Sequence, residues 1–352
     1  MPEFQTPRLV VALRDKDDSS LERSASGGAF PVLARPVLAA GGAVCGAYMR
    51  DDGTVAHCVV RSQSDLALLQ GSAYVQSDLS PAFTDVMNLV SSGVRTLFVG
   101  TPCQCSSMVA FLETKGVLRN PADYESLIVC DLVCHGVPSP MLYDAYRKWL
   151  DHKTGADGGV HGYRFRSKRN GWGLYYYYYY YYKDGRRREV CSPGDSDPYY
   201  GAFLRGESYR PSCYRCPYAR AERTTDFTIG DYWGIESVDP KFFDSRGVSL
   251  LLANTEKGER FFRDEASGGC EFVETDLSSA VRENHNLKAP TAVPAGRQAF
   301  LSHMEQCIKA GDLSPMFDRY LKPPMSLKRI VKDLLPGDAY LSLKKLVKGG
   351  GR

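Results

Sequence analysis

Long hydrophobic runs are missing from the sequence. No stretch of its 352 residues approaches the roughly 20 consecutive apolar residues of a transmembrane helix. The opening MPEFQTPRLVVALRDKDDSS also lacks the basic start and the small-residue cleavage site of a secretory signal. These absences exclude a membrane-spanning protein, and we expect a cytoplasmic location.

A strong charge of either sign is missing too. Lys and Arg total 44 and Asp and Glu total 41, so the net charge at pH 7 is only +3. Nucleic-acid-binding domains are strongly basic, and this balance predicts no nucleic-acid partner. Basic residues gather only near the end, in the amphipathic stretch SLKRIVKDLLPGDAYLSLKKLVKGGGR. Three hypotheses stay open for this tail: peripheral contact with an anionic membrane, docking of a partner, or a solvated helix.

Cysteine, by contrast, occupies 11 positions, an odd number that leaves at least one thiol unpaired in any disulfide scheme. Cytoplasmic thiols stay reduced, so clustered cysteines there act as metal ligands or redox groups. The rest of the composition, 43% hydrophobic and 24% charged, is ordinary for a globular protein that buries a sizeable core without disulfides.

The first half of the chain alternates apolar strands with amphipathic helices, which predicts an α/β sheet. Strand-like runs are RLVVALR, AVCGAYM, TVAHCVV, RTLFVG and SLIVCDLVC, and helix-like stretches are AFPVLARPVLAAGG, LSPAFTDVMNLVSSG and SPMLYDAYRKWLDHK. After about Gly159 the pattern becomes β-rich, and HGYRFRSK, GLYYYYYYYY and RRREVCS predict an antiparallel meander. The predicted class is therefore a mixed α/β fold: an alternating β/α sheet, then a β-rich region, then a helical C-terminal tail.

The run from Tyr175 to Tyr182 predicts a strand in which alternate rings face opposite sides. We expect one set of rings to pack inward and the hydroxyl groups of the other set to face outward. An aromatic platform for a planar ligand is the alternative.

The strongest local signal is the pair Cys213 and Cys216, within RPSCYRCPYAR. Flanking prolines favour a loop over a continuing helix. This spacing occurs in zinc knuckles, in thioredoxin-like motifs and in iron–sulfur sites. A thioredoxin-like motif needs a strand before the pair and a helix after it, and the proline-bounded context argues against that interpretation.

A centre with four thiolates needs two further cysteines, and Cys103 and Cys134 are the best placed. Each follows a strand-like run, TLFVG and LIVCDLV respectively, and parallel strands end at the same edge of a sheet. We expect the two thiols to lie together, with the Cys213–Cys216 loop folded over them, while Cys105 is a competing candidate. The remaining cysteines lie in strand or helix patterns, where a buried free thiol is expected: Cys45, Cys58, Cys130, Cys191, Cys270 and Cys307.

Two further segments could bind a cofactor. In SASGGAF, Ser26, Gly27 and Gly28 precede a helix, where backbone N–H groups either cradle an anion or simply begin a capped helix. In YRFRSK, three basic residues alternate and would share a strand face suited to phosphate or a nucleotide, or exposed to solvent: Arg164, Arg166 and Lys168.

Two candidates for proton or ligand contacts complete the set. His135 follows Cys134 directly and is a candidate proton donor or a support for a metal ligand. Asp231, with Trp233 beside it, follows the strand-like DFTIG. A single histidine is more often structural, so His135 is a weak candidate.

In combination, these segments strongly resemble the coenzyme F420 hydrogenase/dehydrogenase beta-subunit family. The resemblance is carried, in the family's order, by SASGGAF, GSAYVQS, VGTPCQ, CDLVCHGVPSP, FRSKRNGWG, RPSCYRCPYA and DFTIGDYWGIE, which span Ser24 to Thr255. The sequence is most similar to the bacterial branch that is often found beside polysaccharide-synthesis genes.

The resemblance implies an oxidoreductase that passes electrons between a 4Fe–4S cluster, FAD and a hydride carrier or substrate. Carried over, the family's cluster ligands are Cys103, Cys134, Cys213 and Cys216. Segments by the flavin, the turn that links it to the cluster and the basic strand face give the expected cofactor-binding residues: Ser26, Gly27, Gly28, Ser72, Tyr74, Thr101, Pro102, Gln104, Arg166 and Lys168. The implied domains are an N-terminal beta-subunit domain over residues 20–100, a C-terminal cluster and flavin domain over 101–287, and a Pro-rich linker with a helical tail over 288–352.

The sequence also departs from the family pattern. Many relatives begin with a ferredoxin-like module that contains CxxCxxC runs, and this chain has none before Ser24, which implies a separate ferredoxin-like electron donor or acceptor. Ala73 stands where the branch commonly has a lysine. Coenzyme F420 is absent from most bacteria, so the family name does not establish it as a cofactor, and the expected substrate is a small molecule or a sugar.

Two alternative functions use the same residues. Zinc also accepts four thiolates, so the chain could be a structural zinc-binding module in surface-polysaccharide assembly. A folded but catalytically silent family member is the other alternative.

Overall fold

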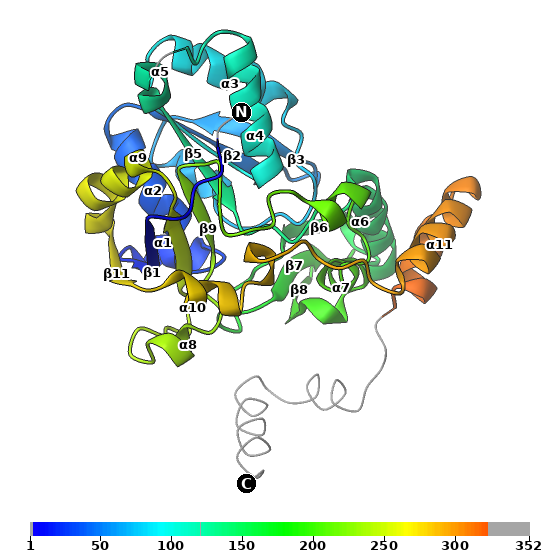
Figure 1. The fold of residues 1–352 in the computed structure, drawn as a ribbon. Helices are drawn as coiled ribbons and strands as arrows, with labels where there is room; N and C mark the ends of the chain where they lie inside the picture. The colour runs from blue at the N-terminus through cyan, green and yellow to red at the C-terminus, as the bar shows by residue number, and fades with distance from the viewer. Residues whose placement is uncertain (1–2, 120, 323–352) are drawn as a thin grey trace.

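The centre of the molecule is an eight-stranded mixed sheet (Figure 1). The computed structural model describes residues 3–119 and 121–322. The strand order is β11-β1-β10-β9-β5-β4-β2-β3. The strands are β1 (Leu9–Asp15), β2 (Ala43–Met49), β3 (Val55–Val60), β4 (Thr96–Gly100), β5 (Leu127–Leu132), β9 (Phe227–Asp231), β10 (Ser249–Ala253) and β11 (Cys270–Glu274). The fold class predicted from the sequence is confirmed.

Five of these strands run in the same direction. β2, β4, β5 and β9 pair in parallel. β10 is antiparallel to both β9 and β1, so β1 points the same way as β9. The carboxyl ends of β1, β9, β5, β4 and β2 therefore meet at one edge of the sheet, where open α/β folds place their ligands.

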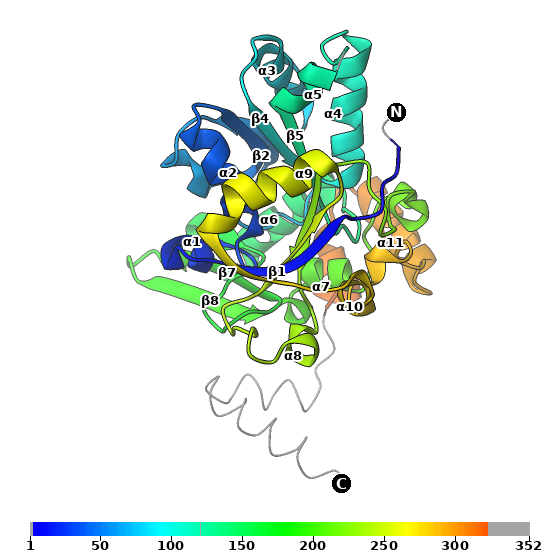
Figure 2. The ribbon, with the colours of Figure 1, turned by 60° about the vertical axis from the view of Figure 1, so that its left-hand side comes forward.

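Helices cover both faces of the sheet (Figure 2). On one face, α2 (Ala29–Ala39) and α9 (Glu256–Phe261) pack over the strands, and α3 (Ser80–Ser91) and α4 (Pro102–Thr114) pack on the other. β4 shows the reason, because its side chains alternate between the two faces. Leu97 belongs to the core beneath α2, and Phe98 belongs to the core beneath α4. Burying each such side chain contributes about 1.5–3 kcal/mol.

Short helices complete the covering of the sheet. α8 (Ile235–Val238) and α10 (Leu277–Arg282) pack against β1 and β10. α1 (Asp18–Arg23) follows β1, and α5 (Pro121–Ser126) precedes β5. Among the described residues, no helix combines the length and the apolar character that a membrane crossing requires.

A second layer is the antiparallel meander of β6 (Asp157–Arg164), β7 (Tyr175–Tyr181) and β8 (Arg187–Pro193). It packs with α6 (Pro140–Thr154), α7 (Pro198–Leu204) and α11 (Arg297–Lys309), which Figure 1 shows grouped on one side of the main sheet. The meander is the one predicted from the sequence. Strands on both sides of residue 101 share the eight-stranded sheet, and the division of the chain at 101 and 288 stays a prediction.

The tyrosine run packs as the sequence predicts. The rings of Tyr176, Tyr178 and Tyr180 lie in the aromatic core of the second layer. On the opposite face, the guanidinium groups of Arg169 and Arg187 lie over Tyr177 and Tyr179, at 4.1 and 4.2 Å from the ring centres. Arginine side chains thus cover Tyr177 and Tyr179, which argues against an aromatic platform for a planar ligand at these two rings.

Two predictions need correction or delimiting. The resemblance implies a turn at TPCQ that links the flavin to the cluster, but α4 begins at Pro102, so Cys103 lies in the first turn of a helix. The proline explains this, because its fixed φ suits the first position of a helix. The basic tail and its membrane hypothesis fall in residues 323–352, outside the described residues.

Candidate functional site

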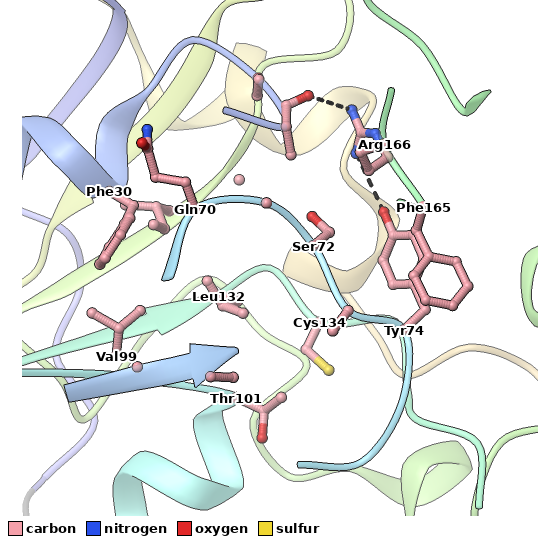
Figure 3. A pocket seen from close by; sticks show the side chains of 18 of the residues that line it. Phe30, Gln70, Ser72, Tyr74, Val99, Thr101, Leu132, Cys134, Phe165 and Arg166 are labelled. Carbon is pink, nitrogen blue, oxygen red and sulfur yellow. Dashed lines mark hydrogen bonds between the residues drawn. The ribbon is translucent and has the colours of Figure 1, made fainter. Parts of the chain in front are cut away.

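A cavity of about 640 Å³ lies at the carboxyl edge of the main sheet (Figure 3). Its wall contains residues that follow β1, β4, β5 and β9, and residues of the meander. The volume is within the roughly 300–1,000 Å³ that is typical of cofactor pockets. The cavity therefore lies where the directions of the strands predict a site.

The Ser-Gly-Gly segment is shaped by its contact with the sheet. Ser26 donates its hydroxyl hydrogen to the carbonyl of Val248, at 2.8 Å. A Cβ on Gly27 would lie 2.3 Å from the backbone of both Leu13 and Ser249, so only glycine fits there. Gly28 has φ of 87° and caps α2, a conformation that other residues rarely adopt. The segment brings the N-terminus of α2 to the cavity wall.

Arg166 joins the second layer to the main sheet. Its guanidinium donates to both carboxylate oxygens of Asp231, at 2.6 and 2.8 Å, and to the carbonyl of Ala25 at 3.1 Å. Burial alone would raise the pKa of Asp231, but the Arg166 charge lowers it below its usual value. The indole N–H of Trp172 donates to the same carboxylate at 2.7 Å. The charges of Arg166 and Asp231 thus neutralise each other within the protein.

Lys168 binds the backbone in and near the Ser-Gly-Gly segment. Its ammonium group donates to the carbonyls of Leu21 and Ser26, at 2.5 and 2.6 Å. Burial lowers the pKa of Lys168 to about 8. Lys168 does not line the cavity. Of the three basic residues predicted to share a face, Arg166 and Lys168 are therefore engaged by protein groups, and the exposed Arg164 at the cavity wall is the one left for a ligand.

The segment from Gly71 to Tyr74 forms another part of the wall. Tyr74 packs its ring on Phe203, with ring centres 4.2 Å apart, and its hydroxyl accepts a hydrogen bond from Arg166 at 3.3 Å. Ser72 lines the cavity beside it (Figure 3). A Cβ on Gly71 would meet no atom within 4 Å, so the wall is open at this point.

A hydrogen-bonded chain connects the start of α4 with a buried histidine that the sequence analysis missed. Gln104 accepts from the backbone N–H of Thr101 at 3.1 Å and donates to the hydroxyl of Ser77 at 2.8 Å. The ring of His57 bonds Ser77 through Nδ1 and the carbonyl of Val99 through Nε2, at 3.0 Å each. Burial lowers the pKa of His57 to about 4, so the ring is neutral. The histidine lies in an ordinary strand pattern, and nothing in the sequence distinguishes it.

The four predicted metal ligands lie close to one another. Burial raises the pKa of the Cys134 thiol to about 12, and the thiols of Cys103, Cys213 and Cys216 act in the same direction. The pKa of Cys216 is raised by burial and then by Cys103 and Cys213. Within the described residues, however, no group of three or more cysteine, histidine or acidic side chains is arranged to hold a metal ion. The donor set is suited to a metal, but the sulfur atoms do not converge on one point.

Backbone pairing explains how the Cys213–Cys216 loop reaches Cys134. The N–H of Arg210 donates to the carbonyl of Val137 at 3.0 Å, and Tyr209 pairs with Pro138. On the other side of the loop, the fully buried Arg223 lies 3.5 Å from the carboxylate of Asp131, at the end of β5. The loop is therefore fixed to the same strand end from which Cys134 emerges.

The rival cysteines are part of the core. Cys105 is fully buried in α4, and its thiol lies 3.4 Å from the carbonyl of Cys130. Burial raises the pKa of both thiols well above the usual value. Cys105 therefore packs away from the other candidate ligands.

His135 lies at the cavity wall, where its side chain is exposed. Desolvation of the ring by the protein around it lowers the pKa of His135, while the charge of Asp231 raises it. The predicted residues that line the cavity are Ser26, Gly28, Ser72, Tyr74, Thr101, Gln104, Cys134, His135, Arg164, Arg166 and Asp231. The predicted residues that do not line it are Gly27, Pro102, Cys103, Lys168, Cys213 and Cys216.

Comparisons with known proteins identify the family of the chain and a protein of similar fold. Residues 93–276 match the family model that describes the C terminus of the coenzyme F420 hydrogenase/dehydrogenase beta subunit. The fold is similar to that of a chain in the F420-reducing NiFe hydrogenase complex from Methanosarcina barkeri, with a TM-score of 0.50 and 15% identity over 88% of this chain and 92% of that chain. The comparison with curated proteins finds no match.

Proposed function

Because the chain belongs to the coenzyme F420 hydrogenase/dehydrogenase beta-subunit family, we propose that it is an iron–sulfur flavoprotein oxidoreductase. It passes electrons between a 4Fe–4S cluster, FAD and a hydride carrier or substrate. Bound FAD would supply the chemistry, since a flavin accepts a hydride and releases electrons singly. The protein positions the cofactors and excludes competing reactions.

The observation that carries the proposal is the group of four thiols beside the cavity. Cys103, Cys134 and the Cys213–Cys216 loop come from three separate segments. Burial raises the pKa of Cys134 and of Cys216, and the nearby thiols of Cys103 and Cys213 raise both further. Thiolates repel each other, and a cationic iron centre would reverse that repulsion. Four thiolates are also the usual ligand set of a 4Fe–4S cluster.

The charges of the cavity wall favour an anionic ligand. Among the described lining residues there are three arginines, Arg23, Arg164 and Arg166, and one carboxylate, that of Asp231. The excess of two positive charges complements the dianionic diphosphate of FAD. Arg166 is paired with Asp231, so Arg23 and Arg164 are the groups that would meet the phosphates.

Partners follow from the same proposal. The similar chain in Methanosarcina barkeri is part of a complex. We expect this chain to exchange electrons with a separate ferredoxin-like protein. The resemblance to a branch found beside polysaccharide-synthesis genes makes a small sugar-containing molecule the first substrate class to test, and coenzyme F420 the first carrier to compare with nicotinamide carriers.

The test is anaerobic purification followed by quantification of iron, sulfide, zinc and flavin. We expect a brown protein that absorbs near ~400 nm, with iron, sulfide and FAD in proportion to the protein. Cys134→Ser should lose most of the iron, and Cys105→Ser, the matched control from the core, should retain it.

A colourless protein that contains zinc would contradict the proposal. It would favour the structural zinc module instead, because four thiolates bind zinc equally well. A protein with both cofactors that exchanges no electrons with any carrier would indicate the silent family member.

A further inference from the structure

The side chain of Tyr74 is held in the cavity wall by its neighbours (Figure 3). Its ring centre lies 4.2 Å from that of Phe203 and 5.4 Å from that of Phe165, and both of these rings line the cavity. The hydroxyl of Tyr199 donates to the backbone carbonyl of Tyr74 at 2.8 Å. The Tyr74 hydroxyl therefore has a defined position in an aromatic part of the wall.

The oxygen of this hydroxyl acts as an acceptor. Arg166 donates to it at 3.3 Å, and a guanidinium group contains no atom that accepts. Tyr200 supplies the neighbouring hydroxyl, which makes no hydrogen bond of ordinary geometry within the described residues. Burial raises the pKa of Tyr200, and its interactions with the Tyr74 hydroxyl raise it further, so Tyr200 keeps its hydrogen and directs it at the Tyr74 oxygen.

The hydrogen of the Tyr74 hydroxyl is left for a ligand. Within residues 3–119 and 121–322, no protein group accepts a hydrogen bond from it. Because Tyr74 lines the cavity, an acceptor bound there can take this hydrogen. Arg166 polarises the hydroxyl from the other side and strengthens the hydrogen bond that it donates.

The surroundings of Tyr74 favour the flavin ring of FAD, and not its diphosphate, as the acceptor. Arg23 and Arg164 are the cationic groups of the wall that are suited to phosphate. The Tyr74 hydroxyl is uncharged, and the rings of Phe165 and Phe203 beside it suit a flat aromatic ligand. The flavin ring carries carbonyl oxygens, which accept hydrogen bonds.

We propose that the Tyr74 hydroxyl donates a hydrogen bond to a carbonyl oxygen of the flavin ring and thereby raises the reduction potential of the bound flavin. Two electrons and one proton convert the oxidised ring into a reduced ring with one negative charge. A hydrogen bond to a charged acceptor is about twice as strong as one to a neutral acceptor, so Tyr74 stabilises the reduced ring more than the oxidised ring. This role rests on the proposed function, because it requires FAD in the cavity, but it requires no metal.

The experiment compares wild type with Tyr74→Phe, which keeps the aromatic ring and removes only the hydroxyl. Isothermal titration calorimetry measures the affinity for oxidised FAD, and a spectroelectrochemical titration of the holoprotein measures the potential of the bound flavin. We expect the affinity to fall about fivefold for oxidised FAD and about tenfold or more for reduced FAD. The potential of the flavin therefore becomes more negative in the variant.

Tyr181→Phe is the matched control. Tyr181 is 39% exposed and does not line the cavity, so the loss of its hydroxyl should change neither the affinity nor the potential. Urea unfolding of both variants tests a merely structural role. A lower stability of Tyr74→Phe with an unchanged flavin potential would show that the hydroxyl only braces Arg166, and it would overturn the proposed role.

Binding of ADP, which has the diphosphate but no flavin ring, tests the other end of the ligand. If Tyr74→Phe weakens ADP, oxidised FAD and reduced FAD equally, the hydroxyl contacts the diphosphate and the assignment to the ring is overturned. The proposed function stands in both of these cases, because wild type still binds FAD. A wild-type protein that binds no FAD would overturn the proposed function and the role of Tyr74 with it.

Discussion

At the scale of single residues, His57 makes the stability of the protein depend on pH. Its ring is buried and neutral, with a pKa of about 4 against 6.5 for the free side chain. Below pH 6.5 the His57 ring binds a proton in the unfolded chain. In the folded chain the ring stays neutral until the pH falls to about 4. The stability contributed by the neutral ring is thus complete above pH 6.5 and is lost as the pH falls towards 4.

We predict that this residue costs the protein about 2 kcal/mol of stability between pH 7 and pH 5. Asp197 opposes it, because burial raises the pKa of that carboxyl to about 6 and the folded state binds its proton first. The measurement is therefore a comparison of urea unfolding for wild type and His57→Gln at both pH values. A difference between the two proteins that does not change with pH would contradict the assignment.

At the scale of elements, the Arg166–Asp231 pair fastens the meander to the main sheet. Only 3% of the Arg166 side chain and 15% of the Asp231 side chain are exposed. Arg166→Met should lower the free energy of unfolding by roughly 3–5 kcal/mol, because it leaves a buried carboxylate without its partner. Urea unfolding at pH 7 measures this loss.

Arg186→Met is the matched control for that substitution. Arg186 pairs with Asp184 on the surface, where the two side chains are 75% and 52% exposed. An exposed pair contributes about 0–1 kcal/mol. Equal losses in the two variants would show that Arg166 does not join the layers.

At the scale of the whole molecule, the cavity lies between the two layers, so a bound dinucleotide would contact both. Arg164 comes from the meander and lines the cavity, and its side chain makes no ion pair or hydrogen bond with residues 3–119 or 121–322. Arg164→Gln should weaken FAD binding about tenfold or more, because a charge-assisted hydrogen bond to phosphate is lost. Isothermal titration calorimetry with FAD checks the prediction.

The exposed Arg188, on β8 and away from the cavity wall, supplies the control. Arg188→Gln removes the same charge from the same layer and should leave FAD affinity within about twofold of wild type at constant salt. Equal weakening in both variants would mean that only the overall charge matters and that Arg164 does not contact the phosphate.

The sequence predicts the architecture well because its signals are local. Alternating apolar residues identify strands such as Leu9–Asp15, and the strand ends place Cys103 and Cys134 at one edge of the sheet. The structure also shows what local patterns could not. Arg166 and Lys168 are engaged by groups far away in the sequence, and His57 depends on Ser77 and Val99 for its environment. Such partners are determined by tertiary packing, so no local pattern reports them.

The helix α7 shows the same limit for an element. Its residues Pro198–Leu204 carry little helical periodicity, and the segment was not predicted. Asp197 caps it by accepting from the N–H of Tyr200 at 2.8 Å, and its aromatic side chains fill the core of the second layer. Tertiary packing around Tyr199 and Tyr200 therefore stabilises a helix that its own sequence barely favours.

The stacked pair Trp172 and Trp233 gives the protein an intrinsic optical probe. Their rings lie 4.7 Å apart and 7° from parallel, and Trp233 lines the cavity. Excitation at the long-wavelength edge of indole absorption avoids the 22 tyrosines and selects the three tryptophans, two of which form this pair. A flavin in the cavity would absorb the light that these indoles emit. Arrival and departure of the ligand can then be followed in real time on the unlabelled protein, and in every variant described above.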